Sequence, residues 1–140
     1  MAIKLGVDTA IAAADAAMGL VNVVGAGTLV VYSGTEPADP AEAITDQVAL
    51  VVFTLPIPVF LPAVDAVSGG RAVMDAVTPV SALEDGDAAW FRLIDGNDRV
   101  ILQGSVSAPL GGGDLTISSV SLVQNIEVSV VSFAYVQPKS

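Results

Sequence analysis

The sequence contains no cysteine and no histidine among its 140 residues. These two absences exclude disulfide scaffolds, zinc sites built from cysteine and histidine, cysteine nucleophiles and catalytic triads with a histidine base. Positive charge is also scarce, because 5 Lys and Arg stand against 15 Asp and Glu, for a formal net charge of −10. Nucleic-acid binding relies on Lys and Arg that meet phosphates, so this balance argues against a nucleic-acid partner.

Apolar residues are abundant instead. Hydrophobic side chains make up 53% of the chain and charged ones 14%, with a mean hydropathy of +0.71, which excludes general disorder. The most apolar stretch, 48–64, is interrupted by prolines and is shorter than the roughly 20 residues that a membrane-spanning helix needs. Asp8 and Asp15 interrupt the Ala-rich stretch near the N-terminus, which argues against a signal peptide. We therefore expect no membrane partner and a single domain over residues 1–140.

One helix is expected, over about residues 9–18, because this segment is mostly Ala, the best helix former. Asp8 or Thr9 would cap its N-terminus, and Gly19 would end it. Its apolar face would be made of Ile11, Ala14 and Met18. From residue 28 onward, short apolar segments separated by Gly, Pro and Asp predict strands. The expected strands are 28–33, 49–55, 59–61, 71–76, 88–94, 99–107, 115–119 and 126–136, with turns at 68–70, 84–87 and 111–114.

The clearest expected element is a β-hairpin around residues 95–98. Residues 88–94 alternate, which places Trp90 and Phe91 on opposite faces of the strand. The Asp-Gly pair in the turn is a strong hairpin signal, and residues 99–107 would form the returning strand. The whole pattern predicts a mainly β protein, with a β-sandwich or jelly-roll-like fold of antiparallel sheets and one short N-terminal α-helix.

Several of the expected strands are apolar on both faces, namely 29–32, 48–53 and part of 128–135. A strand with one solvated face should alternate apolar and polar residues, so the outer faces need a cover. A second subunit would provide that cover in a homo-oligomer, which we favour. The alternative is that the helix at 9–18 folds over its own sheet. The candidate interface residues are Val52, Phe53, Phe60, Leu61, Val130, Phe133 and Tyr135.

Paired carboxylates are the only catalytic groups that this composition leaves open. Acidic residues cluster in 84–87 and 95–98, but acids in tight turns face water, whereas a glycosidase needs two of them across a cleft. The same turns offer oxygen ligands for calcium without the spacing of an EF-hand loop, and turn preference explains their Asp and Asn residues. Residues 111–113, three glycines, lack the Lys-Ser/Thr of a phosphate-binding loop. We expect no catalytic residue, no metal site and no cofactor.

Several short motifs follow one another in order along the chain. They are Tyr32-Ser33-Gly34-Thr35-x-Pro37, Ala89-Trp90-Phe91-Arg92-Leu93-Ile94-Asp95-x-x-Asp98, Leu102-x-Gly104-Ser105-Val106, Gly113-Asp114-Leu115 with Ser118-Ser119, and Val128-Ser129-Val130 with Ser132-Phe133. This ordered set spans nearly the whole chain and resembles a family of small structural proteins of tailed-bacteriophage virions. The family has no catalytic motif to transfer. Residues 56–62 depart from its pattern, because they are more apolar and richer in proline.

The resemblance implies a non-enzymatic virion component, first of all a capsid decoration (cement) protein that binds and stabilises the capsid shell as an oligomer. Its partners would be further copies of itself and the major capsid protein. Because capsid lattices present threefold positions, a homotrimer is favoured. The protein would be made in the host cytoplasm and would reside on the capsid exterior. The alternatives are a tail or fibre accessory protein of the virion, or a lectin-like carbohydrate-binding module.

Overall fold

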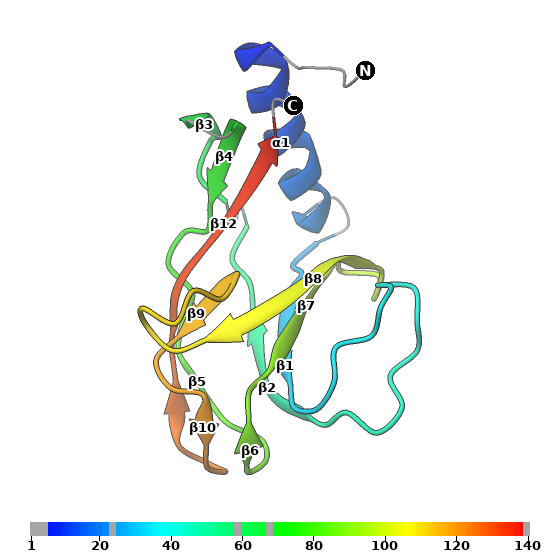
Figure 1. Cartoon of the computed structure of the whole chain (residues 1–140), viewed down its shortest axis with the longest axis vertical. Coiled ribbons are helices and arrows are strands. Elements are labelled where there is room, and N and C mark those ends of the chain that lie inside the picture. The colour runs from blue at the N-terminus through cyan, green and yellow to red at the C-terminus, as the bar shows by residue number, and fades with distance from the viewer. Residues whose placement is uncertain (1–5, 23–24, 58–59, 67–68, 139–140) are drawn as a thin grey trace.

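The computed structural model describes residues 6–22, 25–57, 60–66 and 69–138. It confirms the expected fold class, a mainly β, β-sandwich-like protein with one short N-terminal helix (Figure 1). The elements are α1 (Val7–Gly19), a 3-10 turn (Leu20–Asn22), β1 (Thr28–Tyr32), β2 (Ala49–Thr54), β3 (Val64–Ala66), β4 (Gly69–Val73), β5 (Val80–Ser81), β6 (Gly86–Asp87), β7 (Trp90–Ile94), β8 (Val100–Ser107), β9 (Leu115–Ile117), β10 (Ser121–Leu122), β11 (Glu127–Val128) and β12 (Val130–Pro138).

Within the described residues, eight strands form one hydrogen-bonded sheet in the order β2-β1-β7-β8-β9-β12-β4-β3. The neighbours pair antiparallel, except for β8 and β9, whose parallel pairing the sequence did not indicate. Two short strand pairs, β10–β6 and β11–β5, lie at the lower end of the molecule in Figure 1. The two halves of the large sheet enclose one core, in which Phe91 of β7 packs edge-on against Phe133 of β12 with ring centroids 5.4 Å apart.

The predicted hairpin is confirmed. Strands β7 and β8 pair antiparallel, with Trp90 opposite Ser105 and Leu93 opposite Leu102. The alternation is also confirmed, because Phe91 and Leu93 belong to the main core, while Trp90 lies in a separate apolar cluster on the other face of the sheet. Both ring side chains are buried, and Trp90 has no exposed surface.

Helix α1 begins two residues earlier than expected. Neither Asp8 nor Thr9 caps it, since Gly6 occupies the N-cap position and its carbonyl accepts the amide N–H of Ala10 at 3.0 Å. The helix ends at Gly19, as expected, and its apolar side packs on β4, β12 and β3. A Cβ on Gly70 of β4 would collide with the Ala10 carbonyl, so a glycine is what lets the helix approach the sheet.

This close approach explains one wrong prediction. Residues 69–70 do not form a turn but open β4, beneath α1, while Ser68 lies outside the described residues. The expected turn over 84–87 is also partly wrong, because Gly86–Asp87 forms β6 and pairs with Ser121–Leu122. Of the strand expected at 59–61, Val59 lies outside the described residues and Phe60 forms a single bridge to Met74.

The long strand expected over 126–136 is interrupted. It divides at Ser129 into β11, which pairs with β5, and β12, which pairs with β9 and β4. The register against β9 shifts between Val130 and Ser132, so an extra residue, Val131, bulges out of the ladder. Val131 is therefore 53% exposed while Phe133 is buried, although simple alternation places both on one face.

The outer face of β1 and β7 is covered by the loop over residues 33–48. A small apolar cluster of Val30, Tyr32 and Trp90 lies on this face, and Ile44 of the loop packs against it. The Arg92 side chain holds the loop in place by donating from Nη2 to the Glu42 carbonyl oxygen at 2.8 Å. Each half of the sheet thus has a cover from its own chain, the helix on one and the loop on the other.

Candidate interaction surfaces

Two of the predicted interface residues are buried in the protein's own core. Phe53 of β2 has no exposed surface and Phe133 of β12 has 4%. Phe133 contacts Phe91 and also Phe60, whose ring centroid lies 5.8 Å away. These aromatic side chains join the two halves of the sheet, which is a packing role.

The other five predicted residues are not brought together into one patch. Val52 packs on the outer cluster beneath the loop, and Phe60, Val130 and Tyr135 pack partly against the main core. Leu61 is the most exposed of the set, at 47%. Val52 thus belongs to a different cluster from Phe60, Val130 and Tyr135, and β2 and β12 lie in different halves of the sheet. Their part in an oligomer contact stays a prediction.

The Arg92 side chain links β7 to the loop over residues 33–48, beside the apolar cluster of Val30, Tyr32 and Trp90. Its guanidinium lies 5.2 Å from the centre of the Trp90 ring, and its Nε donates to the Gln103 Oε1 at 3.1 Å. The Tyr32 ring stacks on Trp90 with centroids 4.4 Å apart. Burial raises the pKa of the Tyr32 hydroxyl, and the Arg92 charge acts in the opposite direction. With Trp90 fully covered, its ring offers no stacking platform for a ligand.

The hairpin acid Asp95 closes its own turn. Its Oδ1 accepts the backbone N–H groups of Asn97 and Arg99, both at 2.9 Å, and its Oδ2 accepts Arg99 Nε at 3.1 Å. These bonds, led by the Arg99 backbone N–H, hold the pKa of Asp95 below its usual value. Because the Asp95 carboxylate accepts these three hydrogen bonds within its own hairpin turn, it stabilises the turn.

The acids of 84–87 also have structural partners. Asp85 Oδ1 accepts the backbone N–H of Gln124 at 2.7 Å, and the Ser121 hydroxyl donates to Asp87 Oδ1 at 3.4 Å. In the described part of the chain, no group of three or more acidic side chains is placed to hold a metal ion. The carboxylates of Asp85 and Asp87 therefore act as hydrogen-bond acceptors for neighbouring segments.

One cavity opens between β8 and β12, with a volume of about 400 Å³. Its lining residues are Phe91, Leu102, Gln103, Asp114, Phe133, Ala134, Tyr135 and Val136. Asp114 Oδ2 accepts the Ser105 N–H and hydroxyl, at 3.0 and 3.1 Å. The Tyr135 hydroxyl donates to Gln137 Oε1 at 2.9 Å. The cavity thus combines apolar walls with two polar groups that are already oriented.

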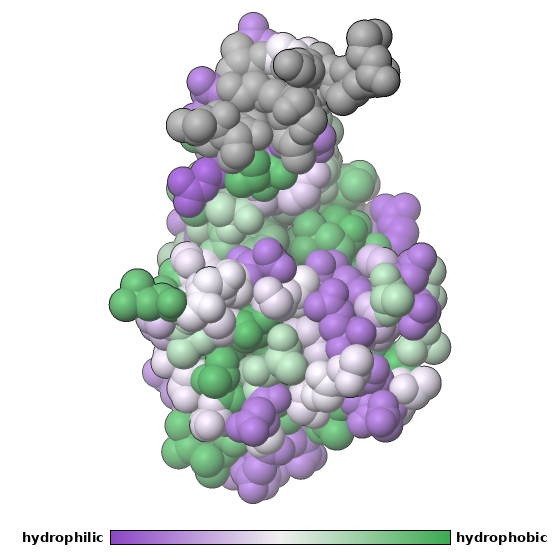
Figure 2. All heavy atoms as spheres, viewed as in Figure 1, coloured by the Kyte–Doolittle hydropathy of each residue, from purple (hydrophilic) through white to green (hydrophobic). Residues whose placement is uncertain are grey.

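Several large apolar side chains are exposed on the described surface: Leu20, Val48, Ile57, Leu61, Val64, Leu83, Leu110, Val123, Ile126 and Val131. Most of them lie within the apolar segments 48–64 and 126–136 that the sequence singles out, but of these exposed residues only Leu61 was predicted to lie at an interface. Leu110 is fully exposed and has a φ of 69°, in the left-handed region that bulky residues avoid. At the lower end of the molecule, apolar and strongly hydrophilic side chains lie side by side (Figure 2).

In the described residues, no helix is long and apolar enough to cross a membrane. No protein-family model, no curated protein and no solved structure matches this chain.

Proposed function

We propose that this chain is a non-enzymatic structural protein of a tailed-bacteriophage virion, first of all a capsid decoration protein that stabilises the shell as an oligomer. The observation that carries this proposal is the set of large apolar side chains left exposed on a domain whose sheet faces are covered from within. Binding by surface complementarity uses such side chains as anchors. The ordered sequence motifs that resemble small phage virion proteins support the same role.

The charge of the molecule supports a location on a particle that contains DNA. A net charge of −10 disfavours adsorption of the protein to packaged or free nucleic acid. A decoration protein on the capsid exterior would meet its protein partners while staying off the genome.

The oligomer proposed is a homotrimer, because capsid lattices present threefold positions and soluble assemblies close by rotational symmetry. Among the residues considered for the contact, Leu61 has the largest exposed fraction, and Ile57, four positions earlier in the chain, is 60% exposed. Analytical ultracentrifugation at tens of micromolar tests this part. A well-folded species at the monomer mass of 14.1 kDa would remove the trimer.

The function is tested on the particle itself. We expect mass spectrometry of purified virions to detect this chain in many copies, and cryo-electron microscopy to place it on the outer surface of the capsid. Density on the tail or fibres would select the accessory role instead. Absence of the chain from the virion would overturn the proposal.

A second candidate function is carbohydrate binding, which the cavity between β8 and β12 favours. The Tyr135 side chain and the Asp114 carboxylate supply the aromatic and hydrogen-bonding groups that sugar sites combine. A glycan array that gives a response lost in Asp114→Ala would select this function, and a blank array would remove it.

A further inference from the structure

Three of the exposed apolar residues come from the turns and short strands at the lower end of the molecule (Figure 1). Leu83, Val123 and Ile126, here called the lower surface, are 50%, 56% and 59% exposed. The backbone holds them together, because the Ile126 N–H bonds the Val123 carbonyl at 3.0 Å and the Ala82 N–H bonds the Ile126 carbonyl at 2.9 Å. Leu83 follows Ala82 directly. These bonds place the backbones of the three exposed residues beside one another, although they come from segments forty residues apart.

The lower surface stands on a fixed framework. The Leu83 N–H bonds the Leu50 carbonyl of β2 at 2.7 Å, which ties the patch to a core strand. The turn that carries Val123 is held by the bond from the Gln124 N–H to Asp85 and by Asn125, which has a φ of 72°. Because these positions are ordered before any partner arrives, binding would sacrifice little conformational entropy.

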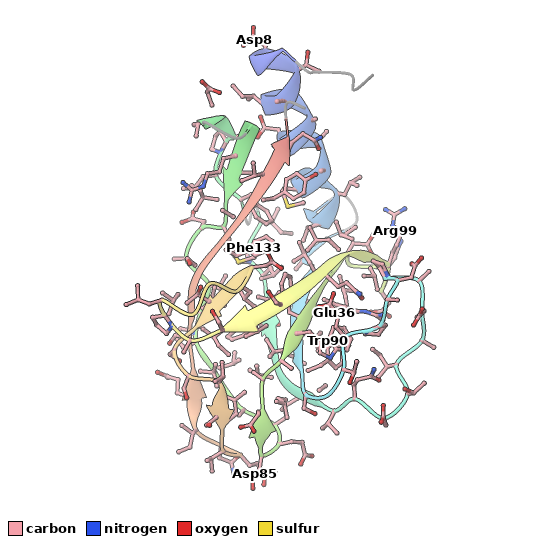
Figure 3. The ribbon with its side chains drawn as sticks, in the orientation of Figure 1. Asp8, Glu36, Asp85, Trp90, Arg99 and Phe133 are labelled. Atoms are coloured by element: carbon pink, nitrogen blue, oxygen red, sulfur yellow. The ribbon has the colours of Figure 1, made fainter. Side chains whose placement is uncertain are left out.

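The described charged residues next to the lower surface are all acidic. Its charged neighbours are Glu84, Asp85, Asp87 and Glu127, from the β5–β6 connection, β6 and β11. The described cations lie elsewhere, with Arg71 in β4, Arg92 in β7 and Arg99 at the far end of the hairpin from Asp85 (Figure 3). Two copies of the lower surface brought together would oppose acid to acid, which costs free energy. Charge complementarity therefore selects a basic partner over a second copy of this chain.

We propose that the lower surface docks onto a protein that presents an apolar patch bordered by Lys or Arg. The identity of the partner rests on the proposed function: it is the capsid shell, and the lower surface is the side of the molecule that faces it. The apolar side chains provide the buried contact, and the acids fix the orientation and speed the encounter.

The test compares two valines of equal exposure. Val123 on the lower surface and Val64 on β3, near the opposite end of the molecule, are both 56% exposed. Val123→Asp and Val64→Asp therefore introduce the same charge at sites with the same accessible fraction. Purified proteins are added to virions produced without this gene, and bound protein is quantified after sedimentation. Leu83→Ser provides a second lower-surface variant, and thermal melting confirms that each variant is folded.

We expect Val123→Asp and Leu83→Ser to lower the affinity for virions at least tenfold, and Val64→Asp to bind like the wild type. We also expect wild-type affinity to fall when ionic strength rises from about 0.05 M to about 0.5 M, since salt screens the acid–base contact. Equal binding by folded Val123→Asp and wild type would overturn this inference and leave the proposed function standing. No binding by the wild type would overturn the proposed function, and the inference with it.

Discussion

Replacing Trp90 by Ala should separate the loop cover from the core. The change removes a ring that stacks on Tyr32, lies beneath the Arg92 guanidinium and donates from Nε1 to the Ser33 carbonyl at 3.2 Å. Large-to-small replacement of a fully buried aromatic residue costs about 3–5 kcal/mol. With a urea slope of about 1–3 kcal/mol per M, the unfolding midpoint should fall by roughly 2 M.

The position of Trp90 predicts which part of the structure the substitution destabilises first. Because its cluster lies between the sheet and the loop over 33–48, the loop should open before the domain unfolds. That loop contains Glu36 and Glu42, so a Glu-specific protease should cut it under native conditions. Peptide mass spectrometry would identify both cleavage sites.

Phe91→Ala is the matched control. Phe91 is the next residue along β7, is also buried, and packs on the opposite face against Phe133. Its loss should lower the midpoint by a similar amount without selective cleavage at Glu36 and Glu42. Trp90→Phe, which keeps a stacking ring and loses the N–H donor, should fall between Trp90→Ala and the wild type. A Trp90→Ala midpoint within about 0.5 M of the wild type, or identical loop cleavage in both alanine variants, would refute the reasoning.

Three further predictions concern single positions. The lowered pKa of Asp95 means that its stabilising bonds are present at neutral pH and are lost as pH falls below the ordinary value of 3.8. Asp95→Asn should therefore make stability less dependent on pH in acid unfolding. Gly70→Ala should lower the melting temperature by many degrees, because its methyl group meets the Ala10 carbonyl and displaces α1. Leu110→Gly should raise stability by up to about 1 kcal/mol in thermal melts, because relief of the left-handed backbone outweighs the added chain entropy.

The hairpin was predictable because its signals are local. The alternation over 88–94 and the Asp-Gly turn lie within a few residues of one another, and together they determine pairing and face. The helix was predictable for the same reason, from its Ala content. Its N-cap was not, because Gly6 takes that position through its backbone carbonyl, which accepts the Ala10 N–H, and a glycine has no side chain that would signal a cap.

The interrupted C-terminal strand shows where alternation fails. Residues 126–136 read as one continuous strand, yet the partner changes from β5 to β9 at Ser129. One bulged residue, Val131, then moves Phe133 to the other face. A period of two along the chain cannot reveal a break that the partner strands impose.

The sequence correctly indicated that two-sided apolar strands need a cover, but it did not identify every cover. The helix was one of the two covers considered. The loop over 33–48 escaped notice because it is acidic and rich in proline, and its contribution depends on Ile44 and on the carbonyl that receives Arg92. Contacts of this kind join residues about fifty positions apart, and a pattern read along the chain does not contain them.

These internal covers change what an assembly has to supply. Because α1 and the loop over 33–48 already lie on the sheet faces, an oligomer contact has less apolar sheet surface left to bury. The apolar surface that remains consists of exposed side chains in turns, loops and strands, among them the lower surface, and it suits docking better than a continuous sheet-on-sheet interface. Among the described residues, the charged neighbours of the lower surface are acidic, so attraction there favours a basic partner over a like-charged copy. The proposed decoration of a shell would use the exposed apolar side chains for docking and the acidic lower surface for a basic partner, with self-association on another side of the domain.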